Sequence, residues 1–390
     1  MALASPTQPQ TSAKAKRLLF IDMFRGLVTL IMMEGHVTNT TILYALRPSH
    51  TFHYLDLLNG MVAPSFIFIA GFAFGLALDR KWDDFLLLRK TFWLQMKRLL
   101  FILGVAYWLH LPTWSFRALL KLDRESIYYA LRCDVLHLIA LSLIAVLLLA
   151  VVVRNKKVFF LLLPVLTLAN VFATPFLYQM ELRNYFPDLI ADYLTDRHGA
   201  LFPIFPWAAY TFAGTFSCWV YLRLRKVNLE DQLFKFLAVF GLMMLIAGFA
   251  LFYLPWSYHT YADASRSSPR HFMLKMGWVY FTLSLFYFYE QIKKPQSSWL
   301  NMVGQESLFV YGFHLVFVYG ASFMPTYIAK AVGPTLTYGP SLLISFLVIS
   351  SMAVCGIVWH LLKERKPVLA KRIFYATAII YFVRFFMWPY

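Results

Sequence analysis

Long apolar stretches recur along the chain and alternate with shorter polar segments. They predict eleven helices, at residues 18–37, 57–78, 99–112, 134–153, 158–178, 201–222, 233–255, 271–292, 300–320, 341–362 and 373–389. Most of these stretches contain about 20 residues, the length that an α-helix needs to cross a bilayer. The strands of a membrane β-barrel would instead alternate polar and apolar residues in segments of about 10. The pattern therefore predicts an all-α, polytopic integral membrane protein with about 10–11 transmembrane helices.

The composition narrows the class of protein further. Hydrophobic residues make up 60% of the 390 residues and charged residues only 14%, whereas an average soluble domain carries about 25% charged residues. So little charge could not cover the surface of two or three soluble domains. We therefore exclude a soluble enzyme, a nucleic-acid-binding domain and a disordered chain. We expect the lipid bilayer as a partner and no nucleic acid.

The net charge of +17 predicts the orientation of the chain in the membrane. Lys and Arg collect in the cytoplasmic loops of helical membrane proteins. With the N-terminus inside, 23 Lys and Arg residues fall on cytoplasmic segments and ten on outer segments. The sequence thus predicts a cytoplasmic N-terminus. The same basic inner surface would attract a polyanionic ligand such as a phosphorylated cofactor.

The organisation of the chain is simple. Residues 1–16 are polar and predict a flexible cytoplasmic N-terminus rather than a cleavable signal. Residues 17–390 contain no long hydrophilic block and predict a single transmembrane domain. We find no internal repeat, which weakens the case for an inverted-repeat transporter. The three cysteines are far apart, so neither a disulfide framework nor a metal site is expected.

The first predicted helix carries an unusual set of ionisable residues, Asp22, Arg25, Glu34 and His36. Such groups are unfavourable in a bilayer and usually face a cavity or each other. Arg25 and His36 are eleven residues apart, close to three helical turns, so they share a face and lie ~16 Å apart along it. Asp22 is close enough to pair with Arg25. The stripe predicts a polar passage; the alternative is a local ion pair and an interfacial histidine.

Three further segments carry candidate chemistry. His50 and His53 precede a helix in which Gly71 and Gly75 permit close packing, although the two histidines taken alone fit a surface role better. Asp134 and His137 have the spacing of a carboxylate that raises the basicity of a histidine; a structural hydrogen bond at a helix start is the alternative. The third segment is a polar stripe that predicts a cavity wall, formed by Ser307, Tyr311 and His314.

Several of these segments resemble the transmembrane acyltransferases. Arg25, ten residues and then His36 are similar to the opening of bacterial membrane carbohydrate O-acyltransferases. Residues 17–27 resemble the opening of the transmembrane acyltransferases in general. Other segments resemble the catalytic domain of the heparan-α-glucosaminide N-acetyltransferase family: residues 63–71, 202–207 and 304–314, with a further family helix start at 134–137. His50 matches an outer-loop histidine of that family by position, whereas His36 stands where the heparan enzyme carries Asn.

The resemblance implies an acyl-CoA-dependent transmembrane enzyme. It would move an acyl group, with acetyl expected, from cytoplasmic acetyl-CoA to a sugar or glycan acceptor on the outer side of the membrane. His36 is then the leading general base and His50 the competing base. The remaining catalytic candidates are Asp134 and His137. The residues expected along the cofactor passage are Asp22, Arg25, Ser307, Tyr311 and His314.

Two other functions stay open on the sequence. Buried cationic and imidazole groups also suit a secondary transporter of a small anion or a lipid-linked sugar. A structural membrane partner without chemistry is a further alternative that the polar stripes disfavour. The expected location is the bacterial cytoplasmic (inner) membrane. The sequence leaves the acceptor, the acyl chain and the formation of a homodimer open.

Overall fold

The computed structural model describes residues 17–253, 268–293, 298–320, 324 and 326–387. The predicted flexible segment 1–16 lies outside the described residues. Within them the chain is built of helices, and no β-strand is present apart from a single bridge between Ile42 and Leu336. The predicted all-α fold class is confirmed.

The first half of the chain forms the helices α1 (Leu19–Thr41), α2 (His50–Asn59), α3 (Val62–Arg80), α4 (Trp82–Leu86), α5 (Lys90–Leu109), α6 (Phe116–Leu119), α7 (Arg124–Leu131), α8 (Val135–Val153), α9 (Lys156–Leu177) and α10 (Asp188–Leu194), with short 3-10 turns η1 (Tyr44–Leu46) and η2 (Leu182–Asn184). The second half forms α11 (Ile204–Arg225), α12 (Glu230–Tyr253), α14 (Pro269–Lys293), α15 (Trp299–Gln305), α16 (Ser307–Tyr319), α17 (Ile328–Ala331), α18 (Tyr338–Arg365) and α19 (Pro367–Met387).

Each of the eleven predicted stretches overlaps a long helix, but three of them differ from the structure. Stretch 57–78 runs across the turn between α2 and α3, and stretch 99–112 misses the first nine residues of α5. The ninth stretch is two helices, α15 and α16, which meet at Glu306. Glu306 accepts hydrogen bonds from Lys363 of α18 and contacts His360, so the break places a carboxylate against two basic groups. The run Gly304–Ser307 interrupts the apolar pattern at this point. The partners of Glu306 lie more than 50 residues away in the chain, so local spacing does not reveal them.

Six of the described helical segments are long and apolar enough to cross a membrane: His50–Arg80, Lys90–Leu109, Val135–Val153, Lys156–Leu177, Glu230–Leu251 and Tyr338–Arg365. The protein is therefore a multi-pass integral membrane protein. The orientation of its N-terminus stays a prediction.

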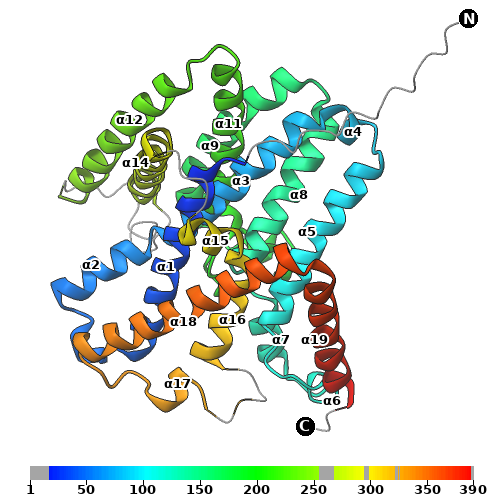
Figure 1. Ribbon diagram of the computed structural model, residues 1–390, viewed down its shortest axis with the longest axis vertical. Coiled ribbons are helices and arrows are strands. Elements are labelled where there is room, and N and C mark those ends of the chain that lie inside the picture. The colour runs from blue at the N-terminus through cyan, green and yellow to red at the C-terminus, as the bar shows by residue number, and fades with distance from the viewer. Residues whose placement is uncertain (1–16, 254–267, 294–297, 321–323, 325, 388–390) are drawn as a thin grey trace, which may run out of the picture.

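The helices pack into one bundle (Figure 1). Helices α12 and α14 lie side by side at one edge of the bundle and α19 at the opposite edge. Helix α4 lies at one end of the bundle, and α6 and α17 lie at the other; we call these the α4 end and the α6 end. Helix α1 packs against α3, α14, α15 and α18. This surrounding shell lets α1 carry charged residues that lipid would not tolerate.

The α3–α11 contact is unusually close. A Cβ on Gly71 would overlap the carbonyl oxygen of Thr211, and a Cβ on Gly214 would overlap that of Phe68. Only glycine lets the two backbones approach this far. The predicted close packing through Gly71 is confirmed, and Gly75 faces Cys218 one turn further on.

The α1–α15 contact also depends on glycines that let two backbones approach closely. A Cβ on Gly26 would overlap the carbonyl oxygen of Leu300, and one on Gly304 would overlap that of Asp22. The contact holds the start of α16 beside the charged part of α1, which brings together two segments nearly 280 residues apart.

Candidate active site

A cavity of about 1340 Å³ lies inside the bundle. Pockets for drug-sized ligands measure about 300–1,000 Å³, so this cavity has room for more than one such molecule. Arg25 and His36 of α1 both line it, as do Arg98 of α5 and His110 just beyond α5. These pairs are eleven and twelve residues apart, which places their members ~16–18 Å apart along each helix. The cavity therefore extends through much of the bundle, from Arg25 and Arg98 towards the α6 end.

Arg25 is the cationic group of α1 in the cavity lining. Its Nη2 donates a hydrogen bond to Ser307 Oγ at 2.7 Å, and its Nη1 lies 4.0 Å from Asp22 Oδ1. Asp22 is buried outside the lining, whereas Ser307 is part of it. The predicted Asp22–Arg25 pair is thus formed, and it orients the guanidinium towards the cavity together with α16.

His36 lines the same cavity about three turns along α1 from Arg25. Its Nδ1 lies 2.8 Å from Nε2 of His314, which is fully buried on α16. The other ring nitrogen of His314, Nδ1, lies 2.8 Å from the carbonyl oxygen of Val310. Two residues of the predicted polar stripe on α16, Ser307 and Tyr311, line the cavity. The third, His314, does not line it but contacts His36, which does.

Asp134 and His137 meet at the start of α8 but not as a carboxylate–imidazole pair. Asp134 is the N-cap: its Oδ1 accepts a hydrogen bond from the Val135 N–H at 2.6 Å. His137 Nδ1 returns the interaction by accepting from the Asp134 N–H at 3.3 Å, which completes a capping box. The alternative of a structural hydrogen bond at a helix start therefore describes the contact between these residues. Asp134 lines the cavity and His137 is buried outside it.

The carboxylate of Asp134 has a partner that the sequence analysis missed. His110 Nε2 lies 3.2 Å from Asp134 Oδ2, and His110 Nδ1 lies 3.1 Å from the Ala106 carbonyl oxygen. Both neighbours accept hydrogen bonds, so the ring is best satisfied as an imidazolium. Burial opposes that charge, yet the hydrogen bond and charge of Asp134 raise the pKa of His110 above its ordinary value. Burial likewise opposes ionisation of Asp134, but His110 holds its pKa below the ordinary value.

His50 occupies a different environment from His36. It is the first residue of α2, is exposed, and lies outside the cavity lining. Asp56 and Asn59, near the end of the same helix, do line the cavity. The roles assigned to His36 and His50 remain predictions, but only His36 is placed against the cavity.

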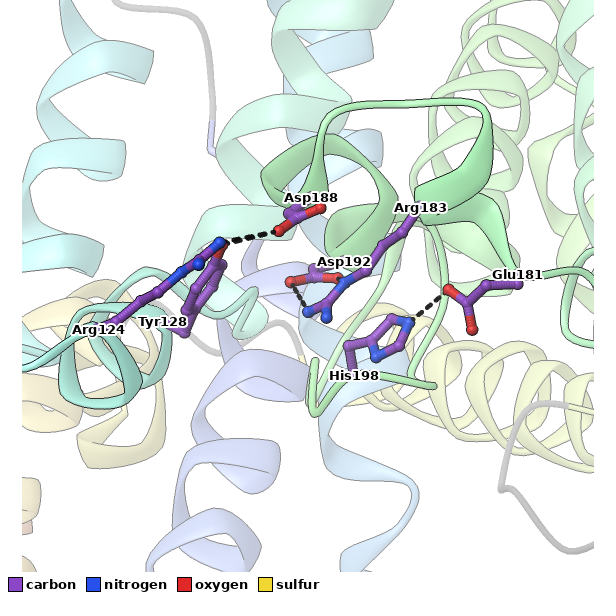
Figure 2. A network of polar contacts seen from close by, with 7 residues as sticks. All are labelled: Arg124, Tyr128, Glu181, Arg183, Asp188, Asp192 and His198. Atoms are coloured by element: carbon purple, nitrogen blue, oxygen red, sulfur yellow. Dashed lines mark hydrogen bonds and ion pairs between the residues drawn. The ribbon is translucent and has the colours of Figure 1, made fainter.

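A polar network joins α7, α10 and the segments on either side of α10 (Figure 2). Arg183 donates two hydrogen bonds to Asp192 of α10, at 2.9 and 2.8 Å. Tyr128 of α7 donates a hydrogen bond to Asp188 at 2.8 Å. His198 contacts Glu181 at 2.8 Å, and this hydrogen bond lowers the pKa of Glu181. The network fastens α7 and the segment after α10, whose neighbouring residues line the cavity: Tyr129, Arg132, Asp196 and 200–203.

Two further residues that line the cavity, His110 and Arg98, could have been identified as candidates from the sequence. His110 falls inside the predicted stretch 99–112, where an ionisable residue marks a functional candidate by default. Arg98 was counted only as part of the basic inner surface. Among the described residues, no group of three or more His, Cys, Asp or Glu side chains is placed to hold a metal ion.

The fold and the cavity define a polytopic helical membrane protein with imidazole and charged groups gathered inside its bundle. Residues 17–257, more than half of the chain, match the family model described as heparan-alpha-glucosaminide N-acetyltransferase, catalytic. The chain belongs to this family, and a membrane acetyltransferase-like function follows from that membership. No curated protein matches the chain. The match contains α1 to α12 and ends before α16, so Ser307, Tyr311 and His314 lie outside it.

Proposed function

We propose that the protein transfers an acetyl group from cytoplasmic acetyl-CoA to a glycan acceptor on the outer side of the membrane. Family membership supports the acetyl transfer. The observation that carries the rest is the cavity, which joins Arg25 and Arg98 towards the α4 end to His36 and His110 nearer the α6 end. With the predicted orientation, the α4 end faces the cytoplasm.

The chemistry of the cavity suits acetyl-CoA as donor. Coenzyme A carries a diphosphate and a further phosphate, and guanidinium groups bind phosphate oxygens with strong, charge-assisted hydrogen bonds. Arg25 and Arg98 supply such groups in the lining. Bound acetyl-CoA supplies an activated thioester. Arg25 and His36 are ~16 Å apart along α1, which leaves room between them for the extended pantetheine arm of acetyl-CoA.

His36 is the general base of the proposed reaction. It accepts the proton of the acceptor hydroxyl or amine while that oxygen or nitrogen attacks the thioester carbonyl carbon. A new C–O or C–N bond forms and the C–S bond breaks. The imidazolium of His36 then returns the proton to the departing sulfur, so the histidine ends the cycle neutral. His110, held as a cation by Asp134, adds positive charge to the same cavity.

Radiolabelled acetyl-CoA tests the proposal. Purified protein in vesicles is incubated with the label and with oligosaccharides ending in an amino sugar, and label is measured on the glycan. We expect His36→Ala to lose transfer by about 100-fold or more, the contribution of a general base, and His50→Ala to keep it. No label on any glycan, or flux of substrate without label transfer, would contradict the enzyme and favour the transporter. An active His36→Ala beside an inactive His50→Ala would move the base to His50.

A further inference from the structure

His314 is a histidine without access to solvent in the middle of an apolar helix. It is fully buried, and both ring nitrogens lie at hydrogen-bond distance from a neighbour. Its ring and that of His36 are nearly coplanar, with an angle of 10° between them, so the hydrogen bond joins the two rings edge to edge. The contact needs an explanation beyond packing, since an aliphatic side chain would fill the space without a polar cost.

The donors and acceptors of this chain of contacts can be assigned. The carbonyl oxygen of Val310 can only accept, so His314 Nδ1 carries a proton and donates it. If His314 Nε2 also carried a proton, the ring would be a cation. Burial opposes that charge, and among the described residues no carboxylate lies within ion-pair distance of the ring. His314 is therefore neutral, and its Nε2 accepts.

The assignment then decides the state of His36. Because His314 Nε2 accepts, His36 Nδ1 must donate, and a neutral His36 has its lone pair on Nε2. Nε2 is the nitrogen left for the cavity that His36 lines. We propose that His314 is a positioning residue that holds His36 in the tautomer whose Nε2 can accept a proton from the acceptor. This inference rests on the proposed role of His36 as the base.

The same contact also serves the second half of the reaction. When His36 takes a proton on Nε2, its Nδ1–H···Nε2 hydrogen bond to His314 becomes charge-assisted and stronger. The chain ends at the Val310 carbonyl oxygen, which has no proton to pass on and no site to hold one. The captured proton therefore has no exit through His314, and it returns to the departing sulfur from His36 Nε2.

Two substitutions at position 314 separate positioning from packing. In His314→Gln the amide oxygen can take the place of Nε2 and accept from His36. In His314→Leu the space is filled but no acceptor remains. We expect His314→Leu to lower kcat roughly 10- to 100-fold with the KM for acetyl-CoA unchanged, and His314→Gln to restore most of kcat. Thermal unfolding of both variants provides the measure of structural damage.

Nitrogen-15 NMR of the protein labelled in its histidine rings reads the tautomer directly, with His36→Ala used to assign the His36 signals. In the wild type we expect Nδ1 protonated and Nε2 bare, and in His314→Leu a shift towards the opposite tautomer. Unchanged His36 signals in His314→Leu, or an unchanged kcat, would overturn the positioning role. If the wild type shows the expected tautomer but transfers no acetyl group, the proposed function fails and the inference about catalysis fails with it, while the tautomer assignment stands.

Discussion

His110 Nε2 lies 3.2 Å from Asp134 Oδ2, and this contact ties the end of α5 to the start of α8 beside the cavity. Asp134 also caps α8 through its other carboxylate oxygen. One side chain thus joins a helix start to a charged partner on another helix. The carboxylate remains ionised although it is largely buried, because both of its oxygens have hydrogen-bond partners.

This ion pair predicts a pH-dependent contribution to stability. The pKa of His110 is raised above 6.5, so its contribution is complete below that value and is lost as pH rises through the higher pKa of the folded state. The pKa of Asp134 is lowered below 3.8, so its contribution is present above that value and is lost as pH falls through the lower folded pKa. We expect Asp134→Asn, which keeps an N-cap side chain, to lower the unfolding temperature most between about pH 4 and pH 6 and less at pH 9.

Asp123→Asn is the matched control for this measurement. Asp123 caps α7 by accepting from the Ser126 N–H at 3.2 Å, and its carboxylate has no imidazole partner among the described residues. Its substitution should change the unfolding temperature equally at pH 5 and pH 9. A pH-independent loss in Asp134→Asn would show that only its capping interaction stabilises the fold.

The α3–α11 crossing predicts a strong effect of a single methyl group. Gly214→Ala places a Cβ against the backbone of Phe68 and Phe72, where neither can move independently of α3. Overpacking of this kind costs about 1–3 kcal/mol. Gly104→Ala in α5 is the control, since a Cβ there meets open space and alanine favours a helix by about 0.5–1 kcal/mol. Equal unfolding temperatures for the two variants would contradict the close approach.

The polar network of Figure 2 predicts unequal contributions to stability from its two arginine–aspartate pairs. Arg183 binds Asp192 through two parallel hydrogen bonds, whereas Arg124 reaches Asp188 at 3.7 Å from an exposed position. We expect Asp192→Asn to destabilise the protein by about 1–3 kcal/mol, because Asp192 is buried and the neutral amide leaves the Arg183 charge without its partner. Arg124→Gln should leave the unfolding temperature unchanged. The reverse order in a thermal unfolding assay would mean that the Arg183 pair does not hold α10.

The helices could be predicted from the sequence because a bilayer requires long apolar stretches, and the same physics makes Asp22, Arg25 and His36 conspicuous. Helical spacing also placed Arg25 and His36 correctly on one face. These predictions depend only on local geometry, which is the same wherever the helix lies in the bundle.

Contacts between distant segments could not be predicted in this way. The spacing of Asp134 and His137 is equally compatible with a side-chain pair and with a capping box, and only the position of the helix start decides. His36 and His314 are 278 residues apart, and their contact depends on how α1 and α16 pack. The role of His110 likewise depends on the packing of α5 against α8, which places it beside Asp134.

Arg25 provides the most direct test of donor binding. Its guanidinium lines the cavity and is oriented by Ser307 at 2.7 Å and by Asp22. Arg25→Lys keeps the charge but loses the planar fork that matches a phosphate group. A hydrogen bond to a charged group contributes about 1.5–3 kcal/mol, so we expect the KM for acetyl-CoA to rise by roughly 10- to 100-fold. Arg89→Lys, at an exposed ion pair with Asp84, is the control and should leave KM unchanged. If Arg25→Lys lowers kcat at an unchanged KM, Arg25 acts on the reacting atoms or on folding of the site rather than on the phosphates of the donor.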